Sequence, residues 1–129
     1  MEPQPIETRR LKNGLTLTIH DLSRKVAADR WRVELSARIT ISVEECWFGP
    51  ALPAPAGLSD MRAALGEAAR IEYRDIRNFV DEREKTVLFE AMRATVYRNA
   101  ESYYSRPDFP GRFLIRQYSA PLRTRPLTD

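Results

Sequence analysis

The stretch Trp31–Val43, WRVELSARITISV, alternates apolar and polar side chains over its whole length. Successive side chains of a β-strand point to opposite faces, so this pattern predicts one long strand, residues 30–44, with one face in the core. Thirteen extended residues span roughly 43 Å, which is longer than the usual strand. We therefore expect a bend or bulge within it, near Ala37.

A hairpin is predicted ahead of this strand. Asn13 and Gly14 are typical of a type I′ turn, because both residues tolerate positive φ. The segment 15–20 alternates apolar and polar residues and predicts a second, half-buried strand. The segment 6–12 is interpreted as the other arm of the hairpin.

Residues 68–79 fit two interpretations. Residues 69–74 alternate as in a strand, whereas Ile76 and Phe79 break that alternation. We interpret the segment as a strand with a slip in phase near Asp75, and a helix is the alternative left open.

Residues 81–104 carry the clearest helical pattern. Asp81 and Glu84 match the spacing of a capping box at a helix start. Apolar residues then recur every three or four positions along one face, at Leu88, Met92, Val96, Asn99 or Ala100, and Tyr103. This stripe predicts a long amphipathic helix that rests on the apolar face of strand 30–44.

The rest of the chain predicts shorter elements. A proline-rich connector, residues 50–57, precedes a short helix at about 59–66, which Gly66 would end. After Pro107, the segment RFLIRQYSA, residues 112–120, is interpreted as a final short strand. Residues 121–129 are expected to form a disordered tail.

Together these elements predict a two-layer α+β fold, with an antiparallel sheet of three or four strands against the long helix. A chain of 129 residues predicts a single domain, residues 1–120. The sequence has no apolar run long enough for a membrane span, and its one cysteine excludes an intramolecular disulfide. We expect a cytoplasmic protein of bacterial origin.

Several kinds of chemistry find no support in the sequence. The five glycines form neither a dinucleotide-binding nor a Walker A motif. One histidine and one cysteine cannot build a structural zinc site. A nucleophilic pair of Cys46 and His20 is disfavoured, because two glutamates precede the thiol. We therefore assign no catalytic, cofactor-binding or metal-binding residue.

The net charge of +3 is unevenly distributed along the sequence. Residues 1–104 hold equal numbers of basic and acidic side chains, so the excess lies in the carboxyl-terminal quarter. Arginines interleaved with aromatic residues can hold phosphates and stack on bases. The candidate nucleic-acid contacts are Arg106, Arg112, Arg116, Arg123, Arg125, Tyr104 and Tyr118.

Two further surfaces are candidates for contact with a protein partner. Trp47 and Phe48 lie beside the proline-rich connector and are a possible anchor, although a packing role is favoured. The polar side of strand 30–44 mixes both charges and is interpreted as an ordinary solvated face, with an interface as the alternative.

Three functions follow from the sequence. The leading hypothesis is a non-catalytic protein interaction or structural module, acting through a protein partner or as a homodimer. The alternative is nucleic-acid binding through the carboxyl-terminal arginines. A weaker alternative is an enzyme whose carboxylates and arginines are brought together only by the fold.

Overall fold

The structure, a computed structural model, describes residues 4–55 and 57–119. Within these ranges a five-stranded antiparallel sheet packs with three α-helices, which confirms the α+β fold. No helix in the same ranges is long and apolar enough to cross a membrane. The elements in chain order are β1 Glu7–Arg10, β2 Thr16–Asp21, β3 Arg24–Ala27, β4 Arg30–Ser42, η1 Glu45–Trp47, α1 Leu58–Leu65, β5 Ala68–Asp81, α2 Lys85–Asn99, η2 Ala100–Tyr104 and α3 Phe109–Ser119.

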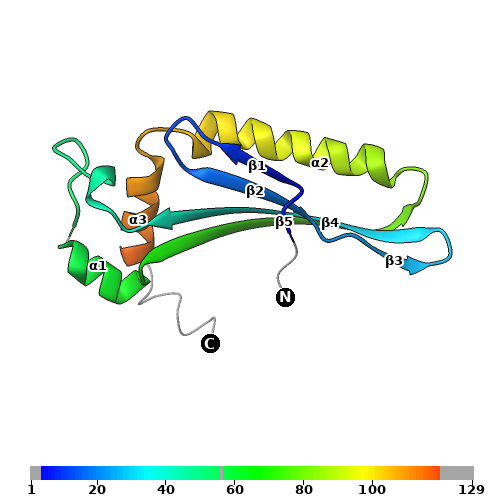
Figure 1. Cartoon of the computed structure of the whole chain (residues 1–129), viewed down its shortest axis with the longest axis horizontal. Helices are drawn as coiled ribbons and strands as arrows, with labels where there is room; N and C mark the ends of the chain where they lie inside the picture. The colour runs from blue at the N-terminus through cyan, green and yellow to red at the C-terminus, as the bar shows by residue number, and fades with distance from the viewer. Residues whose placement is uncertain (1–3, 56, 120–129) are drawn as a thin grey trace.

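Strand β4 is the centre of the sheet (Figure 1). On one side it pairs with β5 over nearly its whole length, from Ser42 opposite Ala68 to Arg30 opposite Asp81. On the other side it pairs with β2 and then β3, and β1 pairs with the outer edge of β2. The predicted strand 30–44 is thereby confirmed as β4, and segment 68–79 is a strand. Strand β3 was not expected from the sequence.

The predicted hairpin at Asn13 is confirmed, with a longer loop than a two-residue turn. The backbone N–H of Leu11 donates to the carbonyl of Leu15 at 2.7 Å, and Gly14 has a φ of 96°. The side-chain amide of Asn13 donates to the carbonyls of Tyr104 and Arg106 at 2.8 and 2.9 Å. Asn13 therefore also ties this hairpin to the chain that follows α2.

The ladder between β4 and β5 is irregular at one point. Two residues of β5, Asn78 and Phe79, stand opposite the single residue Arg32, and Phe79 has a φ of 56°. The bend expected near Ala37 is wrong, because Ala37 pairs regularly with both neighbouring strands. The slip in phase expected near Asp75 lies a few residues later, at this bulge.

Helix α2 covers one face of the sheet (Figure 1). The buried residues of α2 and η2 form one stripe: Phe89, Met92, Val96 and Ala100. They join the apolar side chains of β2 and β4 in a single core. The predicted packing of helix on strand is confirmed. However, Phe89 takes the buried place expected for Leu88, and Tyr103 is 40% exposed.

The predicted start of the long helix at Asp81 is wrong. Asp81 is the last residue of β5, and its carboxylate accepts the backbone N–H of Arg83 at 2.8 Å. Its backbone carbonyl accepts the N–H of Glu84 at 2.8 Å. Asp81 therefore stabilises a turn rather than a capping box, and α2 begins four residues later at Lys85.

Helices α1 and α3 pack together at the end of the sheet where β4 finishes (Figure 1). The predicted short helix is confirmed as α1, and Gly66 ends it with a φ of 89°. The predicted final strand is wrong, since its described part belongs to helix α3. Phe109 and Leu114 of α3 are buried in the core, and Pro110 lies in the first turn, where proline is tolerated.

Candidate functional site

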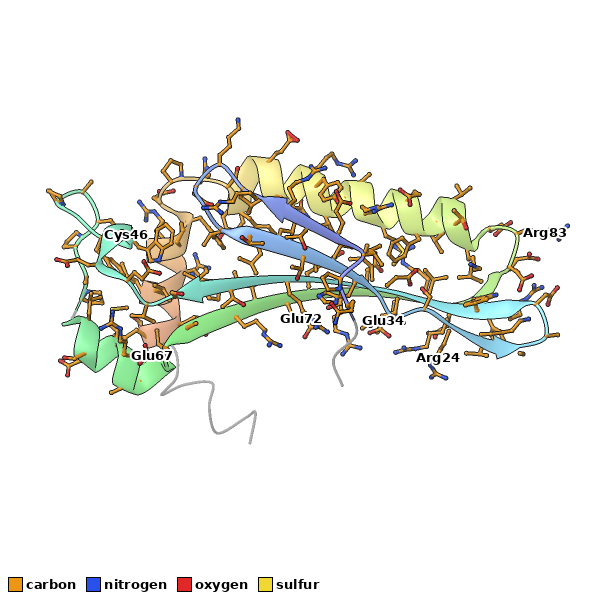
Figure 2. The ribbon with its side chains drawn as sticks, in the orientation of Figure 1. Arg24, Glu34, Cys46, Glu67, Glu72 and Arg83 are labelled. Atoms are coloured by element: carbon orange, nitrogen blue, oxygen red, sulfur yellow. The ribbon has the colours of Figure 1, made fainter. Side chains whose placement is uncertain are left out.

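The sheet has a second face, opposite α2, which we call the polar face. Register assigns to it the even-numbered residues of β2, and those of β4, together with the residues paired with them on β1, β3 and β5. Figure 2 shows Arg24, Glu34 and Glu72 on the side of the sheet away from α2. Within the described ranges α2 packs on the opposite face, so these side chains meet solvent or one another.

The polar face is strongly basic. Among the described strand residues it holds seven arginines, which are Arg10, Arg24, Arg30, Arg32, Arg38, Arg70 and Arg74. Its acidic strand residues are Glu34, Glu72 and Asp81. The strand residues of the face therefore have a net charge of +4, while the rest of the described chain has a net charge of −1.

Glu34 lies at the centre of the face and is only 2% exposed. Its two oxygens bind the guanidinium groups of Arg32 and Arg74, the latter through Nε at 2.8 Å. Burial alone would raise the pKa of Glu34, but the two arginines outweigh it and hold this pKa below its ordinary value. Glu34 is thus a fixed anion between two cations, and it leaves one positive charge uncompensated.

A second network lies beside it. The Ser36 hydroxyl donates to Glu72 at 2.5 Å, and Arg38 Nε donates to the same carboxylate at 3.3 Å. These two groups hold the pKa of Glu72 below its ordinary value despite its partial burial. The two networks connect the polar side chains of β4 with those of β5.

Three arginines at the periphery of the face form no ion pair among the described residues. They are Arg10, Arg24 and Arg70, and all three are exposed. Arg24 of β3 stands directly opposite Arg32 of β4, an arrangement of like charges that destabilises a sheet. Such uncompensated cations are available to an external anion.

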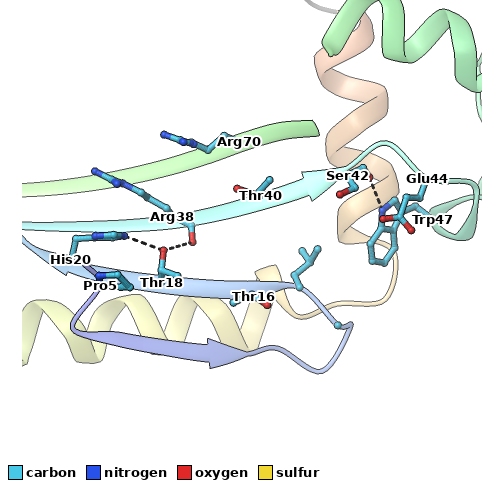
Figure 3. A pocket seen from close by; sticks show the side chains of 12 residues that line it. Pro5, Thr16, Thr18, His20, Arg38, Thr40, Ser42, Glu44, Trp47 and Arg70 are labelled. Carbon is cyan, nitrogen blue, oxygen red and sulfur yellow. Dashed lines mark hydrogen bonds between the residues drawn. The ribbon is translucent and has the colours of Figure 1, made fainter. Parts of the chain in front are cut away.

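A shallow groove of about 440 Å³ crosses the face between β2 and β4 (Figure 3). Its floor carries the hydroxyl groups of four residues: Thr16, Thr18, Thr40 and Ser42. Arg38 and Arg70 line one side. His20 and Trp47 lie at opposite ends, and Glu44 beside Trp47 adds one negative charge. The groove offers hydrogen-bond donors and cations to an elongated ligand.

The carboxyl-terminal arginines gather in part. Arg106, Arg112 and Arg116 line one surface pocket of about 320 Å³, together with Asp108. Arg112 Nε donates to the Asp108 carboxylate at 2.8 Å, so this pocket holds a net charge of +2. Arg123 and Arg125 lie outside the described residues.

The predicted aromatic partners of these arginines are turned towards the interior. Tyr104 packs against Phe109, with ring centroids 5.3 Å apart, and burial raises the pKa of its hydroxyl. Tyr118 is half-buried against the core. Both rings therefore contribute to the packing of the core.

Trp47 and Phe48 are half-buried and pack against the core. The indole N–H of Trp47 donates to the carbonyl of Ser42 at 2.9 Å. A methyl group on Gly111 of α3 would lie 2.6 Å from the carbonyl oxygen of Trp47, so helix and loop are in close contact here. These contacts give both aromatic residues a packing role, and Trp47 also borders the groove.

Two observations on the described residues concern metal binding and the reactivity of the one cysteine. They contain no group of three histidine, cysteine or acidic side chains placed to hold a metal ion. Cys46 is exposed, but partial desolvation and the neighbouring Glu44 raise the pKa of its thiol. A raised pKa keeps the sulfur protonated and weakly nucleophilic.

The basic character of the polar face was missed in the sequence because its seven arginines come from four separate strands. Read on β4 alone, Arg32, Glu34 and Arg38 look like an ordinary mixed face. The signal that could have found it is the alternation within each strand. Arg70 and Arg74 belong to the same alternating set of β5, and the pairing register places that set on the same face as Arg32 and Arg38 of β4.

Comparisons of the chain with protein-family models, with characterised proteins and with solved structures find no significant match.

Proposed function

We propose that this protein is a non-catalytic module that binds nucleic acid through the polar face of its sheet. The observation that supports this most directly is the net charge of +4 on one face that bears no described helix, against −1 for the remainder of the described chain. Concentrated positive charge attracts a phosphate backbone through the release of condensed counterions.

The chemistry of the face suits phosphates. The guanidinium group of arginine matches the geometry of phosphate oxygens, and hydroxyl groups also donate to them. Arg10, Arg24 and Arg70 have no ion pair among the described residues to break before binding. Few aromatic rings border the face, so we expect contacts to the backbone and little sequence preference.

Nucleic acid fits this face better than an anionic membrane does. Membrane-surface segments usually add large apolar anchors to their basic residues. The register assigns mainly hydroxyl and charged side chains to the polar face. Its large exposed apolar neighbours are few: Ile76, and Phe79 at the bulge opposite Arg32. A cytoplasmic location, where nucleic acid is abundant, stays a prediction. The leading hypothesis from the sequence, that the chain binds a protein partner, also stays a prediction.

The proposal is tested with two variants that lose the same charge from different places. One variant replaces Arg10, Arg24 and Arg70 by glutamine on the polar face. The other replaces Arg106, Arg112 and Arg116 by glutamine in the carboxyl-terminal pocket. Binding of labelled single-stranded and duplex oligonucleotides is measured between about 50 and 200 mM salt, with anionic vesicles as a parallel probe.

We expect the polar-face variant to bind at least about tenfold more weakly and its salt slope to fall by about two to three. The carboxyl-terminal variant should bind like the wild type. The reverse result would place binding at the carboxyl-terminal pocket, and equal losses would show a response to net charge alone. Wild-type protein that binds vesicles but no oligonucleotide at about 50 mM salt would overturn the proposal.

A further inference from the structure

Strand β5 leaves one edge of the sheet unpaired. Its fourteen residues, Ala68–Asp81, pair with β4 on one side only, and no strand within the described ranges pairs with the other side. None of these residues is buried, in contrast to β4. A long edge strand presents free backbone N–H and C=O groups that can pair with another strand.

Strand β5 also lacks some of the features that usually protect an edge. It contains no proline, glycine or lysine, and its bulge is confined to Asn78 and Phe79 near its end. The part before the bulge, residues 68–77, is regular. Tyr73 and Ile76 in this regular part are large apolar residues that are 37% and 38% exposed.

We propose that this edge pairs with the same edge of a second copy of the chain, antiparallel and centred on Tyr73. In this register Tyr73 stands opposite Tyr73 of the second copy. Glu72 stands opposite Arg74 of the second copy, and Arg74 opposite its Glu72. Opposite charges and aromatic pairs at directly facing positions both stabilise an antiparallel sheet.

The charge order and the length of β5 together favour this register. A centre at Ile71 would also place Arg70 opposite Glu72 of the second copy, but its ladder would end at Arg74, whereas a centre at Tyr73 uses the regular part of β5 as far as Arg77. A centre at Glu72 or at Arg74 would place that residue opposite itself, so that like charges would face each other across the interface. A centre at Ile76 would draw the bulge at Asn78 into the ladder. The centre of the pairing must also lie on a residue. A centre between two residues would place side chains of the polar face opposite side chains of the other face.

Pairing of this kind has a consequence for the polar face. Two antiparallel strands related by a two-fold axis require that axis to be perpendicular to the sheet. Both polar faces then lie on the same side of one continuous sheet, and both α2 helices lie on the other. The dimer stands independently of the proposed nucleic-acid binding, whereas the enlarged basic surface matters for function only if that proposal holds.

The test uses the full chain with Cys46→Ser, into which Tyr73→Cys or Ile71→Cys is added. Directly opposite residues have Cα atoms about 4.5 to 5.5 Å apart, within the range of a disulfide. In the proposed register the two copies of residue 71 lie four positions apart along the strands, about 13 Å. We expect a disulfide-linked dimer from Tyr73→Cys and none from Ile71→Cys. A disulfide only at position 71 would overturn this register.

Tyr73→Lys provides the second measurement, because it places two positive charges opposite each other. By light scattering at about 100 µM we expect twice the chain mass for the wild type and a monomer for Tyr73→Lys. A monomeric wild type, or a Tyr73→Lys variant that remains dimeric, would overturn the proposal. Oligonucleotide binding by the monomeric variant separates the two proposals, since each copy keeps its own polar face.

Discussion

Glu34 shows how one buried carboxylate organises the polar face. It is held between Arg32 and Arg74, and its backbone N–H donates to the Ser23 hydroxyl at 3.0 Å. Loss of the charge would leave two neighbouring guanidinium groups without their shared anion. A buried ion pair that loses one partner destabilises a protein strongly, although the two arginines here keep partial contact with water.

We predict that Glu34→Gln lowers the free energy of unfolding by about 1 to 3 kcal/mol at neutral pH. Glu90→Gln, which removes a carboxylate that pairs with Arg93 at the surface, is the control and should cost less than about 1 kcal/mol. Urea denaturation of the two variants and the wild type provides the comparison. Equal losses would mean that the network around Glu34 contributes no more than a surface pair.

The effect of Glu34 should depend on pH in a defined direction. Its pKa is lower in the folded than in the unfolded chain, so its stabilisation is fully present above its ordinary pKa of 4.5. That stabilisation is lost as the pH falls through the lowered folded pKa. The difference between the wild type and Glu34→Gln should therefore shrink at about pH 3. A difference that grows on acidification would contradict this.

At the scale of elements, the packing of α2 on β4 holds the two layers together. Val96 faces the sheet and is 2% exposed, whereas Val87 lies on the outer side of the same helix and is 74% exposed. We predict that Val96→Asp abolishes cooperative folding or costs more than about 3 kcal/mol, because it buries a charge in the core. Val87→Asp should change the free energy of unfolding by less than about 1 kcal/mol. Thermal unfolding, monitored by circular dichroism, measures both variants. Similar losses of stability in the two variants would refute this packing.

The elements that the sequence predicted best are those whose pattern is both long and local. The alternation of β4 and the apolar stripe of α2 repeat many times, so their periods are distinct. The segment after Pro107 was misread because a short apolar run does not separate a strand from a helix. Asp81 was misread because the same carboxylate can begin a helix or close a turn. The polar face required the pairing register, which joins residues far apart in the chain.

At the scale of the molecule, the sheet separates two tasks. The face under α2 contains the core, and its residues cannot change without loss of stability. The polar face contributes little apolar burial, so its unpaired arginines among the described residues, Arg10, Arg24 and Arg70, are free of that constraint and can be selected for contact with a ligand. Pairing through the β5 edge, as proposed, would extend the basic surface from one chain to two.

The proposed dimer predicts that thermal stability depends on protein concentration. Pairing through β5 requires a folded sheet, so association stabilises the folded chain by mass action. A tenfold rise in concentration above the dissociation constant adds about 1.4 kcal/mol per dimer, or about 0.7 kcal/mol per chain. For a domain of this size the wild-type Tm should rise by about 3 °C for each tenfold increase. The Tm of Tyr73→Lys should not change with protein concentration over the same range. Scanning calorimetry or fluorescence measures both values of Tm. A wild-type Tm that does not change with concentration would mean that folding and β5 pairing are not coupled.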